Sequence, residues 1–170
     1  MRRTPSFIDP KRIAYAAVLA AMALAVQYFE SLLPPPIPGV PVKLGLANIF
    51  VLYALLSGRP GIAAAVAALK CLLLPLVGGS VSGLLYASAG TALAYAAMRL
   101  LLPMYRRGQV GAAGVSMAGA FLFNVGQLFV GACLLGQSLW LYLVWMGLLS
   151  IPAGICTGLL AAALIRRLPS

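Results

Sequence analysis

Side chains that could perform acid–base or nucleophilic chemistry are scarce in this chain. It has no histidine, and its only acids are Asp9 and Glu30. A histidine-based triad or a histidine metal site therefore cannot form. Two acids this far apart also cannot supply the carboxylate pair of a glycosidase or the carboxylate cluster that holds Mg²⁺ on a diphosphate. These absences predict a protein that is not itself an enzyme and that carries no metal and no cofactor.

The three cysteines, Cys71, Cys133 and Cys156, are widely spaced and lie in apolar runs. We interpret them as buried small hydrophobic residues rather than as a disulfide or metal framework.

Two lysines are better placed for binding than for catalysis. Lys70 lies within an apolar stretch, and Lys43 lies at the start of another. A lysine in hydrocarbon costs about 2.5–3.5 kcal/mol, so Lys70 should face a bundle interior or a watery cavity. Glu30 can offset one of these charges, and an anionic ligand would satisfy the other. The alternatives are that Lys70 snorkels to the headgroups and that Lys43 is a solvated loop charge.

A stripe of small and polar residues recurs three or four positions apart between residues 116 and 131, which places it on one helix face. Its members are Ser116, Ala120, Asn124, Gln127 and Gly131. Asn124 and Gln127 could bind a solute from a cavity wall, with Asn48 at the same level across the bundle. The stripe equally fits a helix–helix contact with interhelical amide hydrogen bonds.

The composition of the whole chain indicates whether these residues lie in a water-soluble protein or in a membrane protein. The chain has 170 residues, of which 63% are hydrophobic and 8% are charged, and its mean hydropathy is +1.04. Soluble domains carry about 25% charged residues, and disordered chains combine low hydrophobicity with high charge. Both classes are excluded. We predict an all-α, polytopic membrane protein that forms one integral domain in the lipid bilayer.

Six apolar segments account for most of the chain, and a spanning helix needs about 20 such residues. They cover residues 13–33, 44–57, 62–77, 84–102, 112–135 and 139–165. Pro152 should kink the last segment rather than divide it, because about 13 residues on each side are too few to cross. The prediction is a six-transmembrane-helix bundle over residues 13–167, preceded by a tail at residues 1–12.

The net charge of +10 comes from twelve basic residues against two acids. Ten of the twelve fall on the side of the predicted termini, and the loops on the other side hold only Lys43. The positive-inside rule then places both termini in the cytoplasm. Lys70 and Glu30 fall in the outer half of the bundle. Topology explains the charge, so no nucleic-acid partner is expected.

The first outer loop is rich in proline, with the sequence Pro34-Pro35-Pro36-Ile37-Pro38-Gly39-Val40-Pro41. Such a segment is stiff and extended. Pro34, Pro36, Pro38, Gly39 and Pro41 could gate a cavity mouth, or the loop could be a rigid connector.

The first segment repeats alanine four positions apart, at Ala16, Ala17, Ala20, Ala21 and Ala25. This surface suits close packing on a partner helix. Gly154 and Gly158 form a similar pair, for which internal packing is an equal alternative.

Two motifs carry a resemblance to a known family. Lys43-Leu44-Gly45-Leu46-Ala47-Asn48-Ile49 after the proline-rich loop, and Asn124-Val125-Gly126-Gln127-Leu128, resemble the Gx transporter family, also labelled heptaprenyl diphosphate synthase component I. The resemblance covers nearly the whole chain. It implies binding roles for Lys43, Asn48, Asn124 and Gln127, whereas Lys70 comes from the burial argument alone.

That family is similar to the S-components of energy-coupling factor (ECF) transporters. Those are six-helix proteins that capture a solute in an outward-facing pocket capped by the first loop. Their Ala-xxx-Ala first helix docks onto a transmembrane component driven by two ATPases. The resemblance therefore implies the same arrangement here, in a bacterial cytoplasmic membrane.

We therefore expect a membrane-embedded solute-binding subunit for uptake of a small anionic or amphipathic solute. The chain has no Walker A glycine loop, so ATP coupling must come from a partner. The alternative is a non-transporting anchor or accessory subunit for isoprenoid or quinone-linked metabolism or for an extracytoplasmic redox system. In that case Lys70 and Asn124 would be internal structural residues.

Overall fold

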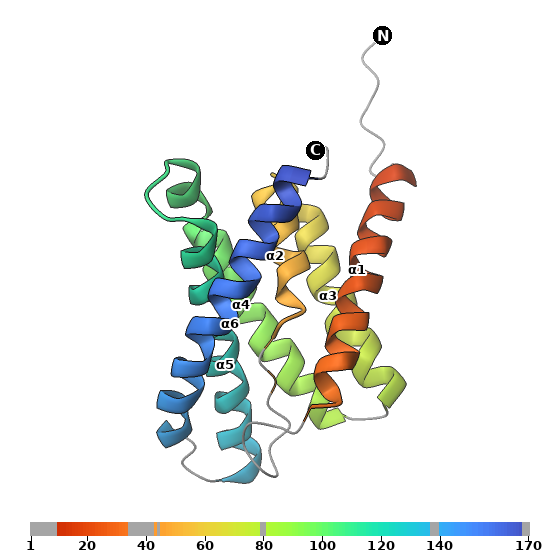
Figure 1. The fold of residues 1–170 in the computed structure, drawn as a ribbon. Coiled ribbons are helices and arrows are strands. Elements are labelled where there is room, and N and C mark those ends of the chain that lie inside the picture. Colours follow the sequence, from red (N-terminus) through yellow and green to blue (C-terminus); the bar gives the residue numbers. More distant parts are fainter. Residues whose placement is uncertain (1–9, 34–42, 44, 79–80, 137–139, 168–170) are drawn as a thin grey trace.

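The computed structural model describes residues 10–33, 43, 45–78, 81–136 and 140–167, and all regular structure within these ranges is helical. The helices are α1 (Pro10–Ser31), α2 (Asn48–Leu56), α3 (Pro60–Gly78), α4 (Val81–Arg106), α5 (Ala112–Leu135) and α6 (Trp140–Arg167). The first residues of α1 and the last residues of α6 lie at the same end of the bundle (Figure 1), which we call the terminal end. The opposite end is the far end.

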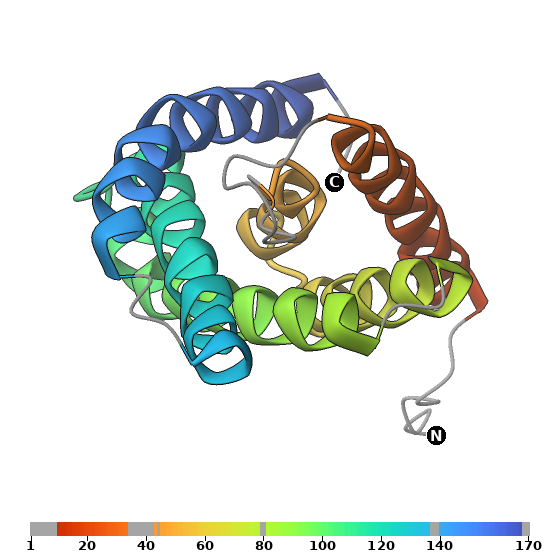
Figure 2. The same cartoon turned by 90° about the horizontal axis from the view of Figure 1, so that it is seen from below.

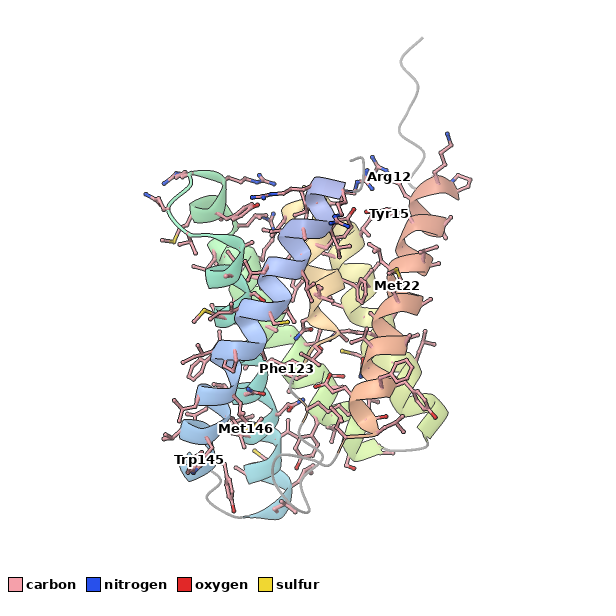
Figure 3. All side chains as sticks on the ribbon, viewed as in Figure 1. Arg12, Tyr15, Met22, Phe123, Trp145 and Met146 are labelled. Carbon is pink, nitrogen blue, oxygen red and sulfur yellow. The ribbon has the colours of Figure 1, made fainter. Side chains whose placement is uncertain are left out.

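Four of the described helices are long and apolar enough to cross a membrane, namely α1, α4, α5 and residues 142–167 of α6. Their outward surfaces carry large apolar side chains, such as Phe29 (68% exposed), Leu100 (76%) and Trp145 (66%). Trp145 lies toward the far end of α6 (Figure 3). Apolar surface this extensive suits lipid rather than water. The chain is an all-helical membrane protein, as its composition predicts.

The short helix α2 occupies the centre of the bundle. Seen along the bundle, the other five helices surround it (Figure 2), and α2 contacts each of them. Eight of its nine residues, from Asn48 to Leu55, are buried. A nine-residue helix is about 13.5 Å long, less than half of the roughly 30 Å hydrocarbon core. Because protein surrounds α2, it does not need the length of a spanning helix.

The surrounding helices form an incomplete ring. From neighbour to neighbour they run α1, α3, α4, α5 and α6, and among the described residues no Cα atom of α1 lies within 8 Å of a Cα atom of α6. The backbones of α1 and α6 are therefore the two adjacent ring members that do not pack closely on each other.

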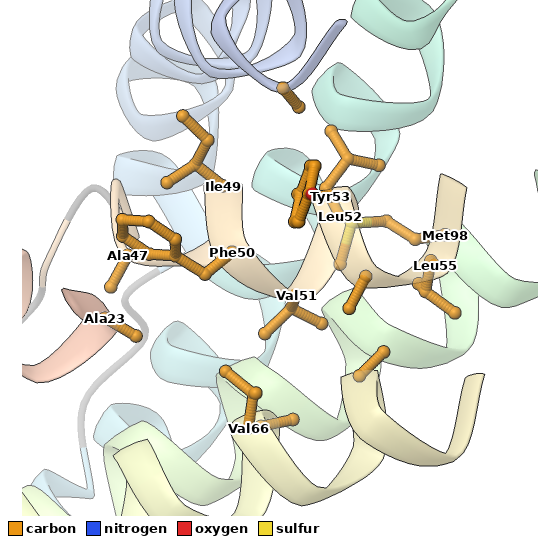
Figure 4. Packing of buried hydrophobic residues seen from close by; sticks show 14 of the residues in the cluster. Ala23, Ala47, Ile49, Phe50, Val51, Leu52, Tyr53, Leu55, Val66 and Met98 are labelled. Carbon is orange, nitrogen blue, oxygen red and sulfur yellow. The ribbon is translucent and has the colours of Figure 1, made fainter. Parts of the chain in front are cut away.

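The apolar core is built around α2 (Figure 4). Val51, Leu52 and Leu55 are at most 1% exposed, and they pack in one cluster with Val66 of α3 and Met98 of α4. Burying a side chain of this size contributes about 1.5–3 kcal/mol. The core therefore fixes α2 between α3 and α4.

Glycines bring α4, α5 and α6 into backbone contact. A Cβ atom at Gly126 of α5 would lie 2.7 Å from the Ala89 carbonyl oxygen of α4. On α6, a Cβ at Gly154 would lie 2.5 Å from the Met117 Cα. The glycine pair of α6, Gly154 and Gly158, therefore serves internal packing, which was one of the two alternatives that its spacing left open.

Some helix limits differ from those expected. The segment 44–57 becomes helical only at Asn48, because Gly45 has a φ of +79° and residues 46–47 form a turn. Asn48 is thus the first residue of α2 and not one turn inside it. Pro103 lies inside α4 rather than ending it, and Pro10 begins α1, so residues 10–12 of the expected tail are helical. Proline suits a first helical position because its missing N–H would be unpaired there.

Candidate functional site

Polar side chains from four helices and one loop gather around the first residues of α2. We call this group the α2-start cluster, and its members are Glu30, Lys43, Asn48, Lys70 and Gln127. Lys70 bonds directly to Asn48, and Gln127 and Glu30 bind the backbone N–H groups of Lys43, Gly45 and Leu46. The sequence predicted Lys43, Asn48, Lys70 and Gln127 as binding residues, and the structure brings all four into this cluster.

Lys70 is the most buried charged side chain of the cluster, with 2% exposure. Its Nζ donates to Asn48 Oδ1 at 2.6 Å and lies 5.4 Å from the centre of the Phe123 ring. Among the described residues, no carboxylate oxygen lies within 4.0 Å of this ammonium group. The Lys70 side chain therefore points into the bundle and does not reach out to the membrane surface, which was the alternative interpretation. A buried ammonium therefore has an amide oxygen and an aromatic face as its partners, but no counter-charge in contact.

The side chain of Asn48 carries a hydrogen-bond donor that the protein leaves unused. Its Oδ1 accepts from Lys70, whereas its buried Nδ2 has no hydrogen-bond partner among the described residues. Asn48 also lines a cavity of about 10 Å³ together with Ser116 and Thr157. That volume is at the lower limit for a single water molecule. An orphaned buried N–H₂ beside an uncompensated ammonium favours an oxygen-bearing anionic ligand.

Glu30 is buried at 6% exposure, and it holds the start of α2. Its Oε1 accepts from the Gly45 N–H at 2.6 Å, and its Oε2 accepts from the Leu46 N–H at 3.2 Å. Charge-assisted bonds of this kind are stronger than neutral ones. The carboxylate is therefore committed to the backbone, and its charge offsets one of the two nearby lysines from a distance.

Lys43 is tied to α5 through its backbone. Its N–H donates to Gln127 Oε1 at 2.9 Å, and its side chain is half-buried. Burial lowers the pKa of the Lys43 ammonium below its usual value, while the nearby Glu30 carboxylate acts in the opposite direction. Gln127 thus fixes the loop residue that carries the second positive charge of the cluster.

The ring of Phe123 of α5 packs against Lys70 and Gly45, and the sequence analysis did not identify this residue. It lies midway along the bundle (Figure 3), and a Cβ atom at Gly45 would lie 2.8 Å from its ring. A Cβ at Gly90 of α4 would lie 2.9 Å from the same side chain. Two sequence features could have pointed to Phe123. It directly precedes Asn124, and the Lys43–Ile49 motif contains Gly45, whose missing side chain leaves room for a large neighbour.

The other polar residues of the α5 stripe face α6. Asn124 Nδ2 donates to the Met146 carbonyl at 3.1 Å and to Ser150 Oγ at 2.8 Å. Ser116 Oγ lies 2.7 Å from Thr157 Oγ1. The stripe therefore divides: Gln127 belongs to the cluster, whereas Asn124 and Ser116 form the helix–helix contact that its spacing also allowed. The structure does not bring Asn124 into hydrogen-bond contact with the cluster.

The alanines of α1 also divide between two faces. Ala20 is 3% exposed and packs inside the bundle, and Ala16 is half-buried. Ala17, Ala21 and Ala25 are exposed at intervals of four residues, so they form the accessible part of the predicted docking face. The predicted gating residues Pro34, Pro36, Pro38, Gly39 and Pro41 lie outside the described residues.

The fold and the cluster define the class of protein: a helical membrane protein with a buried, net cationic polar site. The chain belongs to the heptaprenyl diphosphate synthase component I family, whose family model matches residues 19–164. This is the family that the two motifs resemble. Comparison with curated proteins and with solved structures gives no match.

Proposed function

We propose that this chain is the solute-binding subunit of a membrane transporter, similar to an ECF S-component, and that it takes up a small anionic solute. The chain supplies binding and not catalysis, and a partner with ATPases supplies the energy. Both termini are cytoplasmic in this proposal, and the chain passes the bacterial membrane six times. The α2-start cluster then faces the outer side.

The observation that carries the proposal is the environment of Lys70. A buried charge without a counter-charge in contact is costly, and in membrane proteins such residues mark ligand or ion pathways. Glu30 is not in contact with this ammonium group, and its two oxygens accept from Gly45 and Leu46 instead. An anionic group beside Lys70 would supply the missing charge.

The neighbouring side chains suit the same ligand. Lys43 adds a second positive charge, and the free Nδ2 of Asn48 can donate to an oxygen. Gln127 holds Lys43 through its backbone N–H, and Asn124 joins α5, the helix of Gln127, to α6. With one acid and two lysines, the cluster has a net charge of +1, which matches a monoanionic group.

Entry of a solute requires the cluster to open, because the cavity beside Asn48 measures only about 10 Å³. The loop between α1 and α2 is the element proposed to move, with Pro34–Pro41 as its gate. The exposed alanines Ala17, Ala21 and Ala25 are the surface proposed to contact the energising partner.

The test is ligand binding by Lys70→Met, which keeps the length of the side chain and removes its charge. Native mass spectrometry of the protein in mild detergent identifies the small molecule that copurifies, and thermal unfolding measures the stabilisation it gives. Lys70→Met should retain the fold, and its affinity for the ligand should fall by about 100-fold or more, equivalent to roughly 3 kcal/mol of binding free energy. Arg106→Met, a change of an exposed basic residue at the end of α4, should bind as the parent does.

A second candidate function is a non-transporting accessory subunit. The favouring observation is that Glu30, Gln127 and Lys70 already have hydrogen-bond partners within the protein. This function would be supported, and the transport proposal rejected, if Lys70→Met binds solute normally or if no variant of the cluster affects uptake.

A further inference from the structure

A second charged region lies at the terminal end, on the other side of the bundle from the α2-start cluster. It is a pocket of about 530 Å³ between the first turns of α1 and the α2–α3 connection. Lys11, Arg12, Tyr15, Arg59, Gly61 and Ile62 are among its lining residues. Its volume falls within the range of about 300–1,000 Å³ that is typical of ligand sites. We call it the terminal-end pocket.

The charge of this pocket is strongly positive. Three of its lining residues are basic, and none is acidic. Asp9 is the nearest acid in the sequence and lies outside the described residues. Even if its charge is counted, three cations against one anion leave a net charge of +2. Concave basic surfaces between membrane helices are suited to anionic headgroups.

Arg59 is held in place before any ligand binds. Its guanidinium group lies 4.6 Å from the centre of the Tyr15 ring, and the Tyr15 hydroxyl donates to the buried Tyr53 hydroxyl at 3.0 Å. A guanidinium group carries five N–H donors, so contact with one tyrosine leaves donors for a planar or tetrahedral oxyanion. Arg12 lies three positions before Tyr15, on the same face of α1. Figure 3 shows both residues at the terminal end of that helix.

The backbone adds donors at the same place. α3 begins at Pro60, and the N–H groups of the first helical turn have no partner within their own helix. Gly61 and Ile62 belong to that turn and line the pocket. A Cβ atom at Gly61 would meet nothing within 4 Å, so the approach to this backbone is open. Phosphate groups bind well to such a combination of helix start and arginine.

We propose that the terminal-end pocket binds the phosphate group of an anionic phospholipid. The chemistry alone fits any phosphate, and the surroundings favour a lipid as its source. Val18 (58% exposed) and Met22 (45% exposed) lie three and seven positions after Tyr15 and therefore continue the pocket's face of α1 as an exposed apolar surface. Acyl chains can lie on that apolar surface while the headgroup occupies the pocket. This inference is independent of the proposed solute site.

The experiment compares lipids and variants by native mass spectrometry and by thermal unfolding in nanodiscs. The nanodiscs contain phosphatidylcholine alone or phosphatidylcholine with phosphatidylglycerol. Arg12→Gln combined with Arg59→Gln should weaken phosphatidylglycerol binding by about tenfold or more. The matched control is Arg106→Gln with Arg107→Gln, which removes the same charge from exposed residues at the same end and should bind as the parent does.

Two further measurements keep the test decisive. Arg12→Gln alone changes an exposed residue and should fold normally, so it replaces the double variant if loss of Arg59 stacking prevents folding. Inorganic phosphate in detergent should stabilise the protein much less than phosphatidylglycerol does. Equal stabilisation by inorganic phosphate, or equal losses in the pocket and control variants, would overturn the lipid assignment.

Discussion

Helices α1 and α5 are both long enough to span a membrane, but the bundle holds them in different ways. Nine of the 24 residues of α5 are buried, compared with five of the 22 residues of α1. Glycines bring the α5 backbone against α4 and α6. α1 contacts α2 and α3 but not α6, and polar contacts near its two ends fasten it, through Tyr15 and Glu30.

The difference indicates where the molecule can open. Separating α5 from its neighbours would break backbone contacts along much of its length. Separating α1 from the start of α2 breaks mainly the Glu30 bonds to Gly45 and Leu46 at the far end. Since these bonds border the α2-start cluster, movement near α1 would be the less costly way to admit the proposed ligand.

The largest effect is expected from adding a methyl group in the α5–α6 contact. Gly154→Ala places a Cβ 2.5 Å from the Met117 Cα, so the two backbones must separate. The cost should be about 1–3 kcal/mol or more of unfolding free energy. Gly147→Ala on the same helix is the control, because its Cβ would meet only the Phe121 ring at 3.4 Å. Equal unfolding free energies for the two variants in detergent would contradict a rigid α5–α6 contact.

A second pair of variants separates the inner and outer faces of α1. Ala20→Leu adds volume at a position that is 3% exposed and should cost about 1–3 kcal/mol of stability. Ala17→Leu changes an exposed position and should alter stability by less than about 0.5 kcal/mol. If Ala17 belongs to the docking face, this variant should instead reduce copurification of the energising partner. Unchanged copurification would remove Ala17 from that face.

Glu30→Gln tests the connection between α1 and the start of α2. The variant keeps the shape of the side chain but loses the charge and one acceptor oxygen, so about 1 kcal/mol of stability should be lost. Hydrogen exchange should become faster at the Gly45 and Leu46 amides and stay unchanged at residues of the α5–α6 contact. Equal acceleration in both regions would show that α1 is not the more weakly held helix.

The smallest effect concerns pH and the loop residue Lys43. Burial lowers its pKa, so its ammonium loses a proton at a lower pH than a free lysine does. Above that pKa the cluster has one positive charge fewer, and affinity for an anionic solute should fall by less than about fivefold. Lys43→Arg stays charged and should move this decline to higher pH. An affinity that rises with pH would exclude Lys43 from the ligand site.

Sequence patterns predicted α5 well because its limits are local. Gly111 precedes the helix, and Gly136 ends it in the left-handed conformation with a φ of +61°, which glycine adopts readily. The limits of α2 depend on tertiary contacts instead. Its residues are apolar on every side, so no periodicity marks the helix, and Glu30 and Phe123 help set where it begins.

Only part of the candidate site could be predicted, because some of its residues are marked by local sequence and others only by tertiary contacts. Burial cost alone was enough to single out Lys70, because a charge inside an apolar segment needs a polar surrounding. The separation of Gln127 from Asn124 was not predictable, since both lie within one stripe and their partners come from distant segments. The backbone-directed role of Glu30 was also hidden, because its two donors, the N–H groups of Gly45 and Leu46, come from a distant segment and face Glu30 only in the folded chain.

The central position of α2 has a consequence for how the protein is made. Nine residues cannot cross a bilayer alone, and α2 has five helices as neighbours, three of which follow α3 in the chain. When synthesis has reached only α3, most of the surface that will bury α2 does not yet exist. We therefore expect α2 to reach its buried position only after α4, α5 and α6 have been made.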